Sequence, residues 1–158
     1  MLFYIAGKIV ILILKKSAME IIAYFNILIL IFIGLLHFYW SFGGRIGFMD
    51  SLPEEHGKKL FIPDNKQTAF VASLFTLLSI IHLCYTELLT FPFHENIGKY
   101  GVLILTLIFG IRAFGDFKYL GFTKKIKEGQ FSKNDTLIYA PMCLLISITN
   151  GLLFYFSK

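Results

Sequence analysis

Long apolar stretches alternate with short polar ones along this chain, and their spacing predicts four helices that cross a membrane. A hydrocarbon core about 30 Å thick needs roughly 20 apolar residues in a helix. Stretches of about that length fall near residues 21–42, 68–89, 100–117 and 135–156. Gly43 and Gly44 directly follow the first stretch, and prolines and charged residues separate the others. The expected fold is therefore all-α, an integral membrane four-helix bundle.

The first 18 residues do not fit this pattern. The run before Lys15 is apolar apart from Lys8, and it is too short to cross a membrane comfortably. Lys15 and Lys16 follow the apolar run, whereas the charges of a secretory signal precede it, so a signal peptide is not expected. We divide the chain into an N-terminal extension, 1–18, and a four-span membrane domain, 19–158. Three interpretations of the extension stay open: an interfacial or frayed helix, a later start in the working protein, or a fifth short span.

The amino-acid composition agrees with a membrane protein, and the placement of its charges restricts the expected classes of partner. Hydrophobic residues make up 56% of the 158 residues and charged residues only 16%, whereas a typical soluble domain is about a quarter charged. The formal net charge is +5, and the basic residues lie between apolar spans. That placement favours anionic lipid over nucleic acid as the partner. We expect membrane lipids and no nucleic acid, and we leave open a homo-oligomer or a membrane-protein partner.

Basic residues gather in the first and third loops, which predicts the orientation of the chain. Nine of them are found there: Arg45, Lys58, Lys59, Lys66, Lys118, Lys124, Lys125, Lys127 and Lys133. The opposite side holds only Lys99 and Lys158 once the extension is set aside. Because cytoplasmic loops carry the excess of basic residues, loops 43–67 and 118–134 are predicted to be cytoplasmic in a multi-pass protein of the cell membrane. Three lysines of the third loop are expected to contact anionic headgroups, at about 1 kcal/mol each: Lys124, Lys125 and Lys127.

Ionisable residues at membrane depth are costly and mark candidate sites. His37 lies near the end of the first stretch and Arg112 near the end of the third. The first and third spans run in the same direction, so these residues are expected at similar depth, with the start of the fourth span beside them. We therefore predict a polar cluster at the cytoplasmic mouth of the bundle, formed by His37, Tyr39, Trp40, Arg112, Asp116, Asp135 and Tyr139.

The charges of this cluster allow two interpretations. Arg112 and Asp116 are four positions apart, on one face of a helix. They form either a snorkelling arginine beside an aspartate in water, or a buried charge pair. A carboxylate interacts unfavourably with the dipole at a helix C-terminus, so Asp116 is expected to pair with a residue outside its own helix. Asn134 or Asp135 is expected to cap the fourth helix, and Pro141 to disturb its first turns.

No catalytic, phosphate-binding or metal motif accompanies the cluster, so the cofactor stays unknown and no metal is assigned. We expect a binding or accessory membrane protein in which Arg112 contacts a lipid headgroup or small polar ligand, oriented by His37 and Asp116. The alternatives are a small membrane-embedded enzyme that uses a His37–Asp116 pair to move a proton, and a purely structural subunit. His82, within the second span, is expected only to hydrogen-bond between helices.

Three ordered motifs carry a resemblance to a known family. They are His37-Phe-Tyr39-Trp40 followed by Gly43-Gly44 and Leu52-Pro53, then Arg112-Ala-Phe-Gly115-Asp116-Phe-Lys-Tyr119-Leu-Gly121-Phe122, then Phe131-x-x-x-Asp135-x-x-x-Tyr139-x-Pro141. Together they cover about residues 20–158 and resemble a group of small, mostly bacterial, multi-span membrane proteins catalogued only as a domain of unknown function. The resemblance implies that this group reuses the motif residues and that residues 1–18 are an addition. It brings no activity with it.

Overall fold

The computed structural model describes residues 1–86 and 97–156, and four long helices dominate it. These helices are α1 (Leu2–Ser41), α2 (Asn65–Tyr85), α3 (Ile97–Phe114) and α5 (Ala140–Phe156). A short helix and a π-helical turn lead into α5, namely α4 (Gly129–Asn134) and η2 (Asp135–Tyr139). The first loop carries a 3-10 turn and a two-stranded antiparallel hairpin: η1 (Met49–Ser51), β1 (Glu54–Glu55) and β2 (Lys58–Lys59). The predicted all-α four-helix architecture is confirmed.

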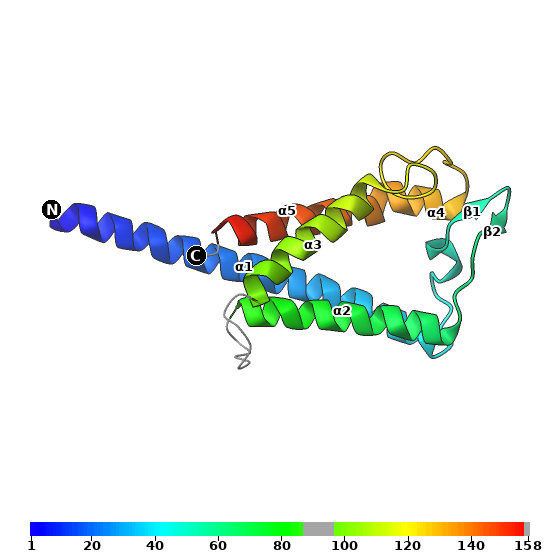
Figure 1. Ribbon diagram of the computed structural model, residues 1–158, viewed down its shortest axis with the longest axis horizontal. Coiled ribbons are helices and arrows are strands. Elements are labelled where there is room, and N and C mark those ends of the chain that lie inside the picture. The colour runs from blue at the N-terminus through cyan, green and yellow to red at the C-terminus, as the bar shows by residue number, and fades with distance from the viewer. Residues whose placement is uncertain (87–96, 157–158) are drawn as a thin grey trace.

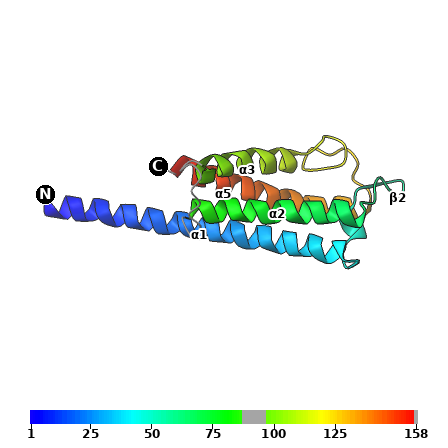
Figure 2. The same cartoon turned by 60° about the horizontal axis from the view of Figure 1, so that its bottom comes forward.

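The four helices form two antiparallel pairs, α1 with α2 and α3 with α5 (Figure 1). The pairs lie close together where α3 begins, and they separate toward the end that carries the hairpin and α4 (Figure 1). Both long loops, residues 42–64 and 115–128, are at this open end (Figure 1). In the second view the helices run nearly parallel and α1 projects past the others (Figure 2). The first and third loops therefore share one side of the bundle, as the span directions predicted.

Three helical segments are long and apolar enough to cross a membrane: Phe3–Ser41, Asn65–Tyr85 and Gly129–Phe156. The other long helix, α3, has 18 residues and is about 27 Å long, slightly less than the hydrocarbon core. It packs along α5 (Figure 1). Residues 2–18 continue α1 without a break, so this 40-residue helix is about 60 Å long, roughly twice the thickness of that core.

The helix ends follow from local chemistry, with one correction. Gly43 has a φ of 94° and its N–H donates to the Trp40 carbonyl, which ends α1 at Ser41 as the glycine pair predicted. The predicted end of the second span at residue 89 lies outside the described residues. The predicted cap of the fourth helix is wrong, because helix α4 begins at residue 129 with Glu128 as its N-cap. Asp135 is consequently a helix-interior residue.

The π-helical turn η2 ends at Tyr139, two residues before Pro141. A proline has no backbone N–H and its ring clashes with the carbonyl four residues earlier, so the α-helical hydrogen-bond ladder cannot continue through residue 141. One wider turn over Asp135–Tyr139 absorbs this break without ending the helix. The predicted disturbance by Pro141 therefore takes the form of a π turn, and this turn borders the candidate site.

The apolar core lies where the two helix pairs meet. Leu30 of α1, Leu105 of α3 and Ile146 of α5 are fully buried and belong to one cluster. Phe109 and Cys143 belong to the same cluster, at its edge toward the open end, where they line the cavity described below. The core therefore leads directly into the cavity.

Polar side chains also tie the helices together inside the bundle. Asn26, His82 and Asn150 are fully buried. His82 Nε2 lies 2.8 Å from Asn150 Oδ1, which joins α2 to α5, and Thr149 Oγ1 donates to Asn26 Oδ1 over 2.9 Å, which joins α5 to α1. Such bonds satisfy polar groups that the surrounding hydrocarbon cannot, although Asn26 Nδ2 is buried without a hydrogen-bond partner. The inter-helix hydrogen bond predicted for His82 is thus confirmed.

Candidate functional site

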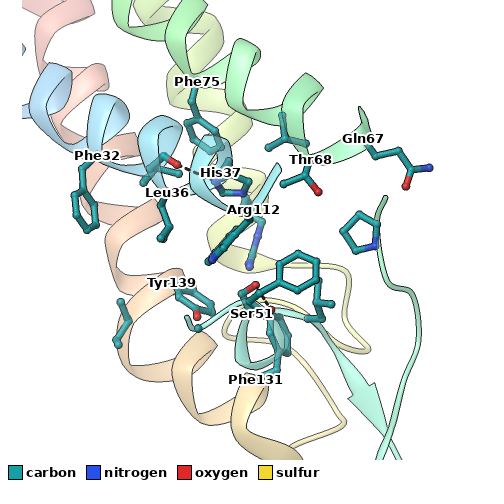
Figure 3. A pocket seen from close by; sticks show the side chains of 18 of the residues that line it. Phe32, Leu36, His37, Ser51, Gln67, Thr68, Phe75, Arg112, Phe131 and Tyr139 are labelled. Carbon is teal, nitrogen blue, oxygen red and sulfur yellow. Dashed lines mark hydrogen bonds between the residues drawn. The ribbon is translucent and has the colours of Figure 1, made fainter. Parts of the chain in front are cut away.

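A cavity of about 1130 Å³ lies at the open end of the bundle, between the two helix pairs. Its walls come from α1, the first loop, α2, α3, α4, η2 and α5. Phe32 and Leu36 line it from α1 and Phe75 from α2, while Arg112 and Tyr139 point into it from the other pair (Figure 3). Pockets for small molecules usually have volumes of about 300–1,000 Å³, so this cavity is large for such a ligand.

A fully buried carboxylate lies behind this cavity. Asp135 Oδ1 accepts a hydrogen bond from Arg112 Nη2 at 2.8 Å. Its Oδ2 accepts from Lys124 Nζ at 2.9 Å and from the Gly121 amide at 2.8 Å. A buried charge needs such partners, and this one is fully committed to groups of the protein itself. In residues 1–86 and 97–156, no group of three or more His, Cys, Asp or Glu side chains could hold a metal ion.

The two cations of this cluster differ in what they have left to donate. The Lys124 ammonium also donates to Thr136 Oγ1 at 2.7 Å and to the Gly121 carbonyl at 3.2 Å, so its three hydrogens are all used. Arg112 uses Nη2 for Asp135, whereas its Nη1 is buried and has no hydrogen-bond partner. Arg112 also lines the cavity. Two cations and one carboxylate leave a local charge of +1, and the free donor is on the arginine.

Asp116 lies outside this cluster and organises the loop that carries Gly121. Helix α3 ends at Phe114, and Gly115, with a φ of 95°, turns the chain away from the helix axis. Asp116 Oδ1 then accepts, over 2.6 to 3.0 Å, from the amides of Lys118, Tyr119 and Leu120. Burial alone would raise the pKa of the Asp116 carboxyl, but these backbone hydrogen bonds outweigh it and hold that pKa below its usual value. The Arg112–Asp116 pair is not formed, because Asp116 lies beyond the helix end.

His37 lines the cavity without an acidic partner. Its Nδ1 is 2.8 Å from the Ile33 carbonyl, and because a carbonyl only accepts, Nδ1 carries a proton. When the ring is neutral, Nε2 is therefore a hydrogen-bond acceptor. The ring packs against Trp40 and Phe75, with centroid separations of 4.9 and 5.4 Å. His37 and Asp116, both within the described ranges, share no hydrogen bond, so the proton-transfer pair considered from the sequence is not formed.

The three tyrosine and tryptophan members of the predicted cluster divide between cavity and surface. Trp40 and Tyr139 line the cavity, and Trp40 Nε1 donates to the Ile46 carbonyl at 2.8 Å, which fixes the indole against the first loop. Tyr39 is exposed and its ring lies against Gly44. Tyr39 is therefore at the surface, where amphipathic rings prefer the membrane interface.

The three lysines expected to contact headgroups also divide. Lys125 and Lys127 are exposed and free to do so, whereas Lys124 is 4% exposed and bonds Asp135. The headgroup contact predicted for Lys124 is thus replaced by an internal one. The sequence does not distinguish Lys124 from the neighbouring lysines, and it does not indicate that the Gly121 amide donates to Asp135. Both contacts depend on how the loop folds back on α3.

At the open end of the bundle, the hairpin joins the first loop to the third loop and to α4. Glu54 accepts from Lys59 Nζ at 2.7 Å and from the Gln130 amide at 2.9 Å. The hydrogen bond from Lys59 holds the pKa of the Glu54 carboxyl below its usual value. Tyr119 donates to Glu55 Oε2 at 2.7 Å. These contacts hold both loops over the cavity.

The family relationship rests on most of the chain. No curated protein and no solved structure matches the sequence. A family model described as a protein of unknown function (DUF3995) matches residues 30–150, a range that includes the cavity and the Asp135 cluster. This agrees with the resemblance to a domain of unknown function. The chain therefore belongs to the DUF3995 family of proteins of unknown function.

Proposed function

We propose that this chain is a multi-pass membrane protein that binds an anionic group at Arg112, in the cavity at the open end of the bundle. The observation that carries the proposal is the buried Nη1 of Arg112, which has no hydrogen-bond partner. An unpaired buried donor costs free energy that a bound acceptor recovers, and a charged acceptor recovers more. The group is a lipid headgroup or a small anion such as inorganic phosphate, which share this chemistry.

Local charge and shape support an anion over other ligands. The cluster of Arg112, Lys124 and Asp135 has a net charge of +1, and Lys124 has no free hydrogen. An anion at Arg112 would neutralise this charge in a setting where water screens it poorly. His37, on the cavity wall, would offer Nε2 to a hydroxyl or a protonated oxygen of the ligand. The proposed role of Asp116 is to hold the loop rather than to orient the ligand.

The proposal includes the orientation and location expected from the basic residues. Loops 43–67 and 118–134 would be cytoplasmic, in a protein of the cell membrane. Both loops lie at the open end of the bundle (Figure 1), and the cavity is at the same end. The anion site would then be reached from the cytoplasmic half of the membrane.

Anion binding by an Arg112→Lys variant tests the proposal. Lysine keeps a positive charge beside Asp135 but lacks the second nitrogen of the planar guanidinium, so it cannot serve Asp135 and a ligand in the same geometry. Titration calorimetry in an uncharged detergent would measure binding of inorganic phosphate and of a soluble short-chain phosphatidylglycerol. A lost charge-assisted hydrogen bond of about 1.5–3 kcal/mol weakens affinity by about tenfold or more.

Lys58→Gln is the matched control. Lys58 is exposed on β2 and is not part of the cavity wall, so this substitution removes one positive charge without changing the cavity. It should bind both ligands as the parent does. Equal binding by the parent and the Arg112→Lys variant, or no binding of either ligand by the parent, would overturn the proposal.

A further inference from the structure

We infer that the occupant of the cavity is an anionic membrane lipid that enters sideways, with its headgroup at Arg112 and an acyl chain in the gap between α1 and the η2–α5 segment. This inference rests on the proposed anion site and narrows its ligand to one class. The evidence for it is that two residues of the cavity wall, Phe32 and Ile138, are also exposed on the outside of the bundle.

The cavity reaches the outer surface of the bundle between α1 and η2. Phe32 of α1 and Ile138 of η2 both line it, and they are 68% and 54% exposed. Phe32 is five residues before His37, which places it about 7.5 Å deeper along the helix. The opening therefore lies along the apolar part of the spans as well as at the loops.

The surface around this opening suits lipid chains. On α1, Leu28, Ile31 and Leu35 are exposed, and all are apolar. Opposite them, η2 replaces an ordinary helical turn with a wider one, next to Pro141. π turns of this kind are frequent at functional sites. A chain leaving the cavity here would pass from apolar wall to surrounding hydrocarbon without meeting water.

The wall composition separates a lipid from a small soluble anion. The cavity wall is mainly apolar, and a phosphate ion makes no favourable contact with such a wall. Its apolar members include Leu36, Phe75, Phe109 and Met142. With phosphate alone, water would have to fill the rest of a cavity of about 1130 Å³ and wet that wall. An acyl chain covers the apolar wall while the headgroup accepts a hydrogen bond from the unpaired Nη1 of Arg112, so a single molecule fits both the apolar and the cationic parts of the cavity.

The chain carries its own probe for this test. Trp40 is the one tryptophan in the sequence, and it lines the cavity while being only 9% exposed. Bromine atoms on an acyl chain quench tryptophan fluorescence on contact, so brominated lipid in the cavity should quench Trp40. The protein would be placed in phosphatidylcholine bilayers that contain a small fraction of brominated phosphatidylglycerol, and compared with bilayers that contain brominated phosphatidylcholine at the same fraction.

The expected result is stronger quenching by the anionic lipid, with an occupancy enriched about tenfold over its bulk fraction, as a 1.4 kcal/mol headgroup preference would give. Arg112→Lys should remove the enrichment, and Lys58→Gln should keep it. Ile138→Asn, which makes the gap polar, should lower quenching by both lipids. Leu137→Asn is its matched control, because Leu137 is in the same π turn and 75% exposed but is not part of the cavity wall.

The outcomes separate this inference from the proposed function. If brominated phosphatidylglycerol quenches Trp40 no more than brominated phosphatidylcholine, or if Ile138→Asn and Leu137→Asn behave alike, the lipid inference is overturned. Phosphate binding that still depends on Arg112 would then leave the anion site standing. If neither ligand depends on Arg112, both the inference and the proposed function are overturned.

Discussion

Replacing Asp135 with asparagine removes the one negative charge from the buried cluster while keeping the shape of the side chain. In the parent, three donors converge on this carboxylate, from Arg112, Lys124 and the Gly121 amide. An asparagine amide can accept on one oxygen only, and its NH₂ group would face another donor. The net charge of the cluster rises from +1 to +2.

The magnitude follows from how deeply each partner is buried. The side chains of Asp135 and Lys124 are 0% and 2% exposed, and that of Arg112 is 30% exposed. Removing one partner of a buried ion pair costs about 3–5 kcal/mol. Water screens part of the Arg112 charge, so the expected loss is at the lower end, about 3 kcal/mol. That is a large part of the about 5–15 kcal/mol by which folded proteins are stable.

Thermal unfolding in detergent, followed with a thiol-reactive dye, would measure this loss. Cys143 is 7% exposed and reacts once the bundle opens, and a Cys84→Ala background leaves it as the sole thiol. A loss of about 3 kcal/mol lowers Tm by roughly 6–12 °C in a chain of this size. Asp116→Asn is the matched control, because its oxygen can keep the backbone hydrogen bonds of an exposed loop. Equal Tm values for Asp135→Asn and Asp116→Asn would refute the reasoning.

The remaining predictions concern the hairpin, the loop and the orientation. The hydrogen bond from Lys59 lowers the pKa of Glu54, so the contact between the Glu54 carboxylate and the Gln130 amide should be complete above about pH 4.5 and be lost as the pH falls through the lower pKa of the folded state. Hydrogen exchange of the Gln130 amide would measure this loss, and Glu54→Gln should abolish its pH dependence. Gly115→Ala should lower the free energy of unfolding by more than about 1 kcal/mol, since φ is 95° there and a Cβ would collide with a loop carbonyl; an unchanged Tm would contradict it. A reporter enzyme that is active only outside the cytoplasm should be active when it is fused after Lys158. Activity of a reporter that works only in the cytoplasm, fused at the same position, would contradict the proposed orientation.

The helices and their order could be predicted because their causes are local. An apolar run of about 20 residues is stable only as a helix in lipid, and the glycine pair after Ser41 ends α1 where it was expected to end. Helix directions then alternate, so the first and third loops must lie at the same end. That reasoning also placed His37, Arg112 and Tyr139 around one space, which is the cavity of the structure.

The partners within the site could not be predicted in the same way. The four-residue spacing suggested that Arg112 pairs with Asp116, yet Arg112 bonds Asp135, 23 positions away. The reason is a single backbone conformation, the positive φ of Gly115, which ends the helix at Phe114, two residues before Asp116. Lys124 looked like its neighbours in a basic run, and only the fold of the loop turns it inward.

The sequence by itself determined that this chain forms membrane-length helices, in which order they run, and on which end its polar residues gather, because hydropathy and helix-breaking residues act over short distances along the chain. Only the tertiary structure decided which charges pair and where a cavity remains. Those features depend on how surfaces from different helices meet or fail to meet, here on two helix pairs that pack closely at one end and separate at the other. The free nitrogen of Arg112 is a product of that packing.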